Sequence, residues 1–356
     1  MFAAFRKRFF RSPGSKVVCR WVFGGLCFLG LARLCLAQDF STASAINNRG
    51  QIVGGSFLND QSAFVAYLLG KKKVENLGTF GGFAARADSI NERGHAVGQA
   101  DTTDIDLNGN VISLAFLYDG KQMNNLGTLP GFRHSQAFSI NNAGVAVGWS
   151  YNLSPTGRDE LGFQAFVRHK QTMLPIGDLG GGSSVAFGIN ALGLIVGRAR
   201  LPNGQFHAFI YSYGVMRDLG TLGGTRSEAR AINIWGQAVG QASLAGTTVI
   251  NHAALFQAGK VIDLGTLGGI RSRAWSINDR GEIVGESITA TGESHAFLYA
   301  DGQMHDLGTL GGSFSIAFGI NNRGDIVGQS ETATGDLHAF LVVDGLMIDI
   351  DAQLPQ

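Results

Sequence analysis

The stretch Ala317-Phe-Gly-Ile-Asn-Asn-Arg-Gly-Asp-Ile-Val-Gly-Gln-Ser330 contains the phrase that decides the fold. Its Ile-Asn pair occurs seven times in the chain, with spacings of 43 to 50 residues. The copies begin at Ile46, Ile90, Ile140, Ile189, Ile232, Ile277 and Ile320. Repeats of this length are typical of stacked or radial β arrays, in which each copy is a small sheet that buries its faces against its neighbours.

Each copy of the repeat reads as four short strands. In the last copy we expect them over 317–320, 325–330, 338–342 and 346–350. An Asn-x-x-Gly turn at 321–324 joins the first two strands, because Asn and Gly tolerate the positive φ of tight hairpin turns. Four strands in about 45 residues match a propeller blade, and a closed ring of blades hides the sheet edges. We predict an all-β, seven-bladed β-propeller, with a linear β-solenoid as the alternative.

The first 37 residues have the pattern of an export signal. A basic start is followed by an apolar run from Trp21 to Ala32, and Cys35-Leu36-Ala37 places small residues at a cleavage position. A membrane anchor is the competing interpretation, but a spanning helix needs about 20 apolar residues, and Arg20 and Arg33 interrupt this run. We therefore predict a signal peptide at 1–37, a propeller at 38–356, a secreted or periplasmic location and no membrane anchor after cleavage.

Removing the leader changes the charge of the protein. The leader holds seven of the 28 Lys and Arg residues and no acidic residue, so 21 basic and 27 acidic residues remain. A net charge of −6 argues against a general nucleic-acid or anionic-membrane binder. The three cysteines leave with the leader, so we expect neither disulfide nor thiol nucleophile in the mature chain, which we predict to be a monomer. These cysteines are Cys19, Cys27 and Cys35.

Several phrases of the repeat resemble the HAF family of extracellular repeats. They are His295-Ala-Phe, His338-Ala-Phe, Asp263-Leu-Gly-Thr-Leu-Gly-Gly and Ile320-Asn-Asn-Arg-Gly. The resemblance covers about residues 43 to 351 and implies an exported bacterial repeat protein, without known catalytic residues. The first three copies depart from the family phrase, with other residues in place of the His: Ser62, Leu114 and Gln164.

A recurring His is the most conspicuous ionisable residue of the repeat, and each copy of it stands 11 residues before an Asp. A hairpin centred on the intervening turn places the two diagonally on one face, within hydrogen-bonding reach. The pairs are His207 and Asp218, His252 and Asp263, His295 and Asp306, and His338 and Asp349. Since a catalytic site is needed once and this pair occurs four times, we interpret it as structural rather than catalytic.

Ligand-binding candidates come from residues that are not repeated. In an up-and-down blade, the loop between the second and third strands and the linker to the next blade emerge on one rim, here called the linker rim. We expect five arginines there to bind carboxylate or phosphate groups of an anionic glycan or a protein ligand. These are Arg86, Arg133, Arg226, Arg271 and Arg273. The alternative is a set of solvated charges.

Two tryptophans of the repeat, Trp235 and Trp275, are expected in different environments. Trp235 lies in an Asn-x-x-Gly turn on the opposite rim, where an exposed indole could stack on a sugar or a protein partner. Trp275 occupies a large-residue position of a first strand and is interpreted as core.

A polar segment of the second copy suggests a binding site for Ca²⁺. Asp104, Asp106 and Asn108 stand at alternate positions before Gly109, like the start of a calcium loop. The late acidic ligand is missing, so an ordinary polar hairpin tip is the alternative. Otherwise we expect no cofactor.

No assembled catalytic motif is found, and the leading prediction is a non-catalytic binding or scaffold protein. The alternative is a propeller hydrolase or lyase with a site in the central channel. The two differ in an observable way. An enzyme should show a non-repeated, convergent cluster of ionisable residues in the channel, whereas a binding protein should show a broad groove of Arg and aromatic residues on a rim.

Overall fold

The computed structural model describes residues 40–58, 62–71, 73–154, 156, 160–246 and 250–355. The predicted signal peptide at 1–37 lies outside the described residues. Within them, no helix has the length and apolar character needed to cross a membrane.

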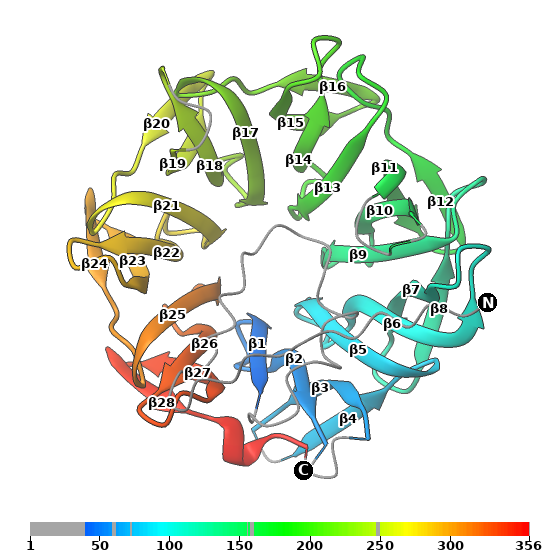
Figure 1. The fold of residues 1–356 in the computed structure, drawn as a ribbon, viewed down its shortest axis with the longest axis horizontal. Coiled ribbons are helices and arrows are strands. Elements are labelled where there is room, and N and C mark those ends of the chain that lie inside the picture. The colour runs from blue at the N-terminus through cyan, green and yellow to red at the C-terminus, as the bar shows by residue number, and fades with distance from the viewer. Residues whose placement is uncertain are drawn as a thin grey trace, which may run out of the picture.

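Twenty-eight strands form the described part of the chain, and they group into seven blades around a ring (Figure 1). The first two blades are β1 (Ser41–Ile46), β2 (Ile52–Phe57), β3 (Phe64–Leu69), β4 (Val74–Gly78), then β5 (Gly81–Ile90), β6 (Ala96–Ile105), β7 (Val111–Tyr118) and β8 (Met123–Gly127). The third and fourth are β9 (His134–Ile140), β10 (Ala146–Leu153), β11 (Glu160–His169), β12 (Thr172–Pro175), then β13 (Ser184–Ile189), β14 (Ile195–Arg200), β15 (Phe206–Ser212) and β16 (Val215–Asp218).

The remaining three blades have the same order. They are β17 (Gly223–Ile232), β18 (Ala238–Leu244), β19 (Asn251–Gln257), β20 (Lys260–Asp263), then β21 (Gly268–Ile277), β22 (Ile283–Thr289), β23 (Ser294–Ala300), β24 (Gln303–Asp306), and finally β25 (Gly311–Ile320), β26 (Ile326–Thr332), β27 (Leu337–Val343) and β28 (Leu346–Asp349). A short 3₁₀ helix, η2 (Asp351–Gln353), follows.

The ring closes by packing of the first blade against the last, and each described blade is built from consecutive strands that pair antiparallel. At the closure, Gln329 Nε2 donates to the Ser41 carbonyl at 2.8 Å, and the Ala339 N–H donates to Ser41 Oγ at 2.9 Å. Ile350 and Leu354, from the C-terminal segment, are buried in the same interface. The predicted class, an all-β propeller, is thus confirmed, and the closed ring excludes the linear solenoid alternative.

The interfaces between blades form the core. In the interface of the fifth and sixth blades, Phe297 from an Ala-Phe phrase is fully buried with Val239 and Ala253 of the fifth blade. Alanines on one blade leave room for the Phe of its neighbour, which explains why small and large residues recur together in the repeat.

A closed belt of hydrogen bonds explains the Ile-Asn pair. The Asn of each blade donates from Nδ2 to the backbone carbonyl of the corresponding Asn in the next blade, at 2.9 to 3.2 Å, and Asn321 returns to Asn47 at 3.1 Å. The side-chain oxygen meanwhile accepts from its own hairpin turn, as Asn141 Oδ1 does from the N–H groups of Ala143 and Val145, both at 3.0 Å. One side chain therefore shapes the turn and joins two blades.

Each innermost strand carries a β-bulge at the same place, just before the Ile-Asn pair. In β17, Ala229 pairs with Gly240 and Ala231 with Val239, so Arg230 has no partner across the strand pair. Gly240 is required there, since a Cβ on it would lie 1.9 Å from the Glu228 carbonyl oxygen. The bulged residues of the seven blades are Ser44, Asp88, Phe138, Phe187, Arg230, Trp275 and Phe318.

Candidate site in the central channel

The seven bulged residues converge on the central channel, where all of them line one cavity of about 230 Å³. Bulges commonly redirect a side chain in this way. An Ala precedes the bulged residue in every blade and the Ile-Asn pair follows two positions later, but the bulged residue itself is a Ser, an Asp, an Arg or an aromatic residue. The channel therefore presents different side chains on a uniform scaffold, a signal that the sequence contains and that our sequence analysis missed.

Asp88 is the acidic bulged residue. Its Oδ1 lies 2.7 Å from Arg86 Nη2, and its Oδ2 accepts from Gln136 Nε2 at 2.8 Å. Burial raises the pKa of the Asp88 carboxyl above its ordinary value, although the charge of Arg86 and the hydrogen bonds from Gln136 and Arg86 oppose this shift. A largely buried carboxyl with a raised pKa on a cavity wall is suited to proton transfer.

A cluster of arginines lies around Glu228 and comes from β14, β17 and β21 of the fourth to sixth blades. Figure 1 shows β17 and β21 across the ring from β5, the strand of Asp88. Arg230 Nη2 lies 2.8 Å from Glu228 Oε1, and Arg198 Nη1 lies 3.4 Å from Oε2. Burial alone would raise the pKa of Glu228, but the charges of Arg230, Arg198 and Arg273 outweigh it and lower the pKa to about 2. Glu228 is therefore a permanent carboxylate that fixes the arginines.

Two aromatic rings lie close to the guanidinium group of the bulged Arg230. Its guanidinium carbon lies 4.0 Å from the ring centroid of Phe187 and 4.6 Å from that of Trp275, within the range of cation–π attraction. Trp275 lines the channel cavity, so its interpretation as a core residue is wrong. The cause is the bulge, which turns this position toward the channel instead of the interface between blades.

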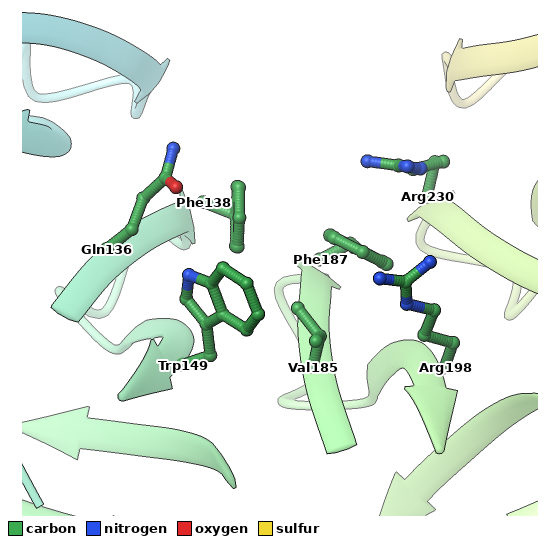
Figure 2. A pocket seen from close by; sticks show the side chains of 7 residues that line it. All are labelled: Gln136, Phe138, Trp149, Val185, Phe187, Arg198 and Arg230. Atoms are coloured by element: carbon green, nitrogen blue, oxygen red, sulfur yellow. The ribbon is translucent and has the colours of Figure 1, made fainter. Parts of the chain in front are cut away.

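A smaller pocket of about 20 Å³ adjoins the channel between the third, fourth and fifth blades (Figure 2). It shares Phe138, Phe187 and Arg230 with the channel cavity and adds Trp149 and Arg198. The other lining residues are Gln136 and Val185.

The five arginines predicted for the linker rim are not brought together there. Arg133, Arg226 and Arg271 are exposed. Arg86 and Arg273 are partly buried, where Arg86 contacts Asp88 and Arg273 Nε donates to Gln241 Oε1 at 3.1 Å. The inner strands begin at or just before the Gly-Gly pair, earlier than expected, so Arg86, Arg226, Arg271 and Arg273 lie within strands and not in linkers.

The three predicted calcium ligands are separated by their other contacts. Asp106 Oδ1 accepts from the N–H groups of Asn108 and Asn110 at 2.8 and 2.9 Å, and Asn108 Nδ2 donates to the Leu153 carbonyl at 2.8 Å. Asp104 is exposed. In the part of the chain that the structure describes, no group of three or more His, Cys, Asp or Glu side chains is arranged to hold a metal.

Asp106 also has a contact that the sequence did not indicate, 3.2 Å from His134 Nε2. His134 Nδ1 accepts from the Ser113 N–H at 3.3 Å, and the imidazole stacks on Tyr151 with centroids 5.1 Å apart. Burial lowers the pKa of His134, against the hydrogen bond and charge of Asp106. The imidazole is fully buried, and the pair joins the second and third blades.

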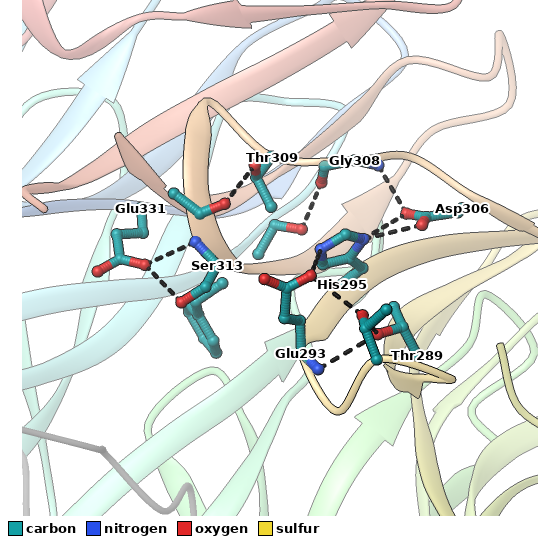
Figure 3. A network of polar contacts seen from close by, with 12 residues as sticks. Thr289, Glu293, His295, Asp306, Gly308, Thr309, Ser313 and Glu331 are labelled. Atoms are coloured by element: carbon teal, nitrogen blue, oxygen red, sulfur yellow. Dashed lines mark hydrogen bonds and ion pairs between the residues drawn. The ribbon is translucent and has the colours of Figure 1, made fainter. Parts of the chain in front are cut away.

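The four predicted His–Asp pairs are confirmed, with Nδ1 to carboxylate distances of 2.7 to 2.9 Å. Figure 3 shows one of them: Asp306 accepts from His295 and also from the Gly308 N–H at 2.8 Å. The Asp thus joins the outer hairpin to the linker that follows. Trp235 is exposed, as predicted, and its Nε1 donates to the Asp279 carbonyl of the next blade at 2.9 Å.

Fold and channel together define the class of the protein as a β-propeller whose channel wall carries non-repeated ionisable and aromatic residues. No family model and no curated protein matches the sequence, so the resemblance to the HAF repeats stays a prediction.

Solved structures do match. The β-propeller domain of the Trilobed protease from Pyrococcus furiosus is 10% identical with a TM-score of 0.52, and the match covers 88% of this chain and 98% of that one. Pyrococcus horikoshii acylaminoacyl peptidase is 12% identical with a TM-score of 0.52, over 87% of this chain and 52% of the peptidase. A structure of a prolyl endopeptidase is 9% identical with a TM-score of 0.57, over 88% and 49%.

These identities show a shared fold. This chain spans about half the length of the acylaminoacyl peptidase and the prolyl endopeptidase. The matched structures are those of hydrolases, and this finding overturns the prediction of a non-catalytic binding or scaffold protein. The alternative prediction, a propeller enzyme with a site in the channel, agrees better with these matches and with the ionisable residues on the channel wall.

Proposed function

We propose that the protein is a propeller hydrolase and that its reaction takes place in the central channel. The observation that carries the proposal is the set of seven bulged residues, which vary while the scaffold around them repeats. A purely structural channel would have no need of a buried Asp on one wall and an Arg on the opposite wall.

Asp88 is the acid–base group in this proposal. Its carboxylate, oriented by Arg86 and Gln136, takes a proton from the water that attacks the substrate. Arg230, fixed by Glu228 and the two aromatic rings, lies across the channel and positions the substrate. The leader pattern supports a site of action outside the cytoplasm.

The test is hydrolysis of a mixture of synthetic peptides, since the matched structures include peptidases. Products are detected by mass spectrometry. We expect Asp88→Asn to lower kcat/KM by roughly 10² to 10⁴, the usual contribution of a positioned acid–base group. Asp301→Asn, in an exposed turn of the sixth blade, is the matched control and should leave kcat/KM unchanged. Absence of cleavage above the blank, or an unchanged Asp88→Asn variant, would contradict the proposal.

A further inference from the structure

We propose that the substrate of the channel carries a bulky apolar side chain, aromatic or aliphatic, which lies against an arc of aromatic residues on the channel wall. This inference rests on the proposed hydrolase function and names the class of substrate that the channel selects. The arc consists of the bulged residues of the third, fourth, sixth and seventh blades, and we call it the aromatic arc. Its members are Phe138, Phe187, Trp275 and Phe318.

The members of the aromatic arc form one continuous row with Arg230, the bulged residue of the fifth blade. The ring centroids of Phe138 and Phe187 lie 5.2 Å apart. Those of Trp275 and Phe318 lie 5.5 Å apart, and both pairs have an edge-to-face geometry. Arg230 connects the two pairs, since its guanidinium carbon lies 4.0 Å from the ring centroid of Phe187 and 4.6 Å from that of Trp275. Figure 2 shows the beginning of the row, in which Phe138, Phe187 and Arg230 follow one another.

The aromatic arc is accessible from the channel. Phe138, Trp275 and Phe318 are only half-buried, and all four members line the channel cavity. The ring of blades does not require aromatic residues at this position, because the first and second blades hold Ser44 and Asp88 there. Contiguous apolar surface that solvent can reach commonly marks a binding site. The aromatic arc is therefore suited to bind an apolar part of the substrate.

The charge in the middle of the row does not call for an anionic substrate. Arg230 Nε and Nη2 lie 2.9 and 2.8 Å from Glu228 Oε1. Against the effect of burial, the charges of the neighbouring arginines lower the pKa of Glu228 to about 2, so this carboxylate stays ionised. The guanidinium group of Arg230 already has a counter-charge, and an apolar group beside it leaves no charge unpaired.

The polar part of the channel wall lies between the two ends of the aromatic arc. It carries Ser44 and Asp88, from the neighbouring first and second blades. Gln136, two residues before Phe138, donates to Asp88 at 2.8 Å, so the arc begins next to the proposed acid–base group. A cavity of about 150 Å³ holds a benzene ring, and the channel cavity measures about 230 Å³. One bulky side chain can thus lie against the arc while the adjoining peptide group faces Asp88.

Calorimetric titration with neutral amino-acid amides tests the apolar preference without requiring hydrolysis. N-acetylphenylalanine amide and N-acetylleucine amide are compared with N-acetylglutamine amide, which has the same backbone and a polar side chain. We expect at least one of the two apolar amides to bind about tenfold or more tightly than the glutamine amide. Burial of apolar surface against the rings is favourable, whereas the side-chain amide of glutamine would lose its water there.

Peptide hydrolysis extends the test to the reaction. Three peptides that differ only in one residue, phenylalanine, leucine or glutamine, are compared in kcat/KM. We expect at least one of the two apolar peptides to exceed the glutamine peptide by about tenfold or more, the usual range for a side chain that fits an apolar site.

Variants then assign the preference to the aromatic arc. Phe318→Ser gives the seventh blade the residue type that the first blade carries at Ser44, and it should reduce the preference for the apolar amide several-fold. Tyr213→Asn is the control, because Tyr213 is an exposed aromatic residue in an outer hairpin turn, and it should keep the preference. Asn accepts the positive φ of that position. If Phe318→Ser fails to fold by circular dichroism, Phe138→Ser decides.

The inference is overturned if the three amides bind equally or not at all, or if the Ser variant keeps the full preference, in which case the aromatic arc only fills the channel. Failure of the hydrolase proposal gives a different pattern. A preference for apolar amides that depends on Phe318, without cleavage of any peptide, would support the aromatic arc and contradict the proposed reaction. Cleavage that Asp88→Asn abolishes, at equal kcat/KM for apolar and glutamine peptides, would support the reaction and overturn the role of the aromatic arc.

Discussion

One residue per blade, the bulged residue, faces the channel, and the register of its strand places it there. Arg230 faces the channel because it is bulged between Ala229 and Ala231, and the same holds for Asp88 between Ala87 and Ser89. The bulge places the carboxylate of Asp88 on the channel wall, largely buried and beside Arg86.

The pH dependence of hydrolysis should reveal Asp88. As a base it must be deprotonated, so activity is lost as pH falls through its pKa. Because burial raises that pKa, we expect the acidic limb of kcat/KM to lie above the ordinary Asp value of about 3.9, with a slope of about tenfold per pH unit. The limb should persist in Asp301→Asn and disappear from the residual activity of Asp88→Asn. A limb at or below the ordinary value would contradict this assignment.

The Asn-x-x-Gly turn between the first two strands of each blade also joins that blade to the next. Asn141 is 7% exposed and donates to the Asn190 carbonyl at 3.2 Å. Asn141→Asp keeps the oxygen that accepts from the turn but replaces the Nδ2 donor by a second oxygen. This oxygen and the Asn190 carbonyl are then two acceptors that face each other in a buried position. We expect a loss of about 1 to 3 kcal/mol in the free energy of unfolding at pH 7, measured by urea titration.

The same variant should show a pH dependence of known sign. Burial and the opposed Asn190 carbonyl raise the pKa of the new carboxyl, although the two N–H groups of the turn oppose this shift, so the loss should deepen as pH rises above about 4. Asn142→Asp is the matched control, because Asn142 is exposed and keeps its acceptor contact with the Glu92 N–H at 2.9 Å. It should change stability by less than about 0.5 kcal/mol. Equal effects at Asn141 and Asn142 would show that the belt adds nothing to stability.

Ring closure is a property of the whole molecule. Ile350 and Leu354 are 2% and 3% exposed and pack between the first and last blades, and Asp351 accepts a hydrogen bond from Ser41 Oγ. A chain that ends at Asp349 should therefore lose about 3 to 6 kcal/mol of stability, since each buried side chain contributes roughly 1.5 to 3 kcal/mol. Thermal and urea unfolding measure this loss.

The control for that truncation is Leu346→Ala, in the last strand but 69% exposed. We expect it to change stability by less than about 0.5 kcal/mol. An intact unfolding midpoint in the truncated chain would mean that the ring closes without its C-terminal segment.

The sequence predicted those features that repeat and missed those that do not. The spacing of His295 and Asp306 defined their pair, because a regular hairpin fixes which side chains face each other. Trp275 was misplaced because strict alternation along a strand assigned it to the core, whereas a one-residue bulge changes the face on which a side chain lies. Nor could spacing bring Arg198 to Glu228, which belongs to another blade.

The bulge also has a consequence for how such a protein changes over generations. A blade can be duplicated as a complete unit, since its Ala, its Ile-Asn pair and its Gly recur in every copy. The single residue between them then mutates without disturbing the copy. The side chains that line the channel can therefore change by point mutations at the bulged positions, while the repeated residues keep the fold.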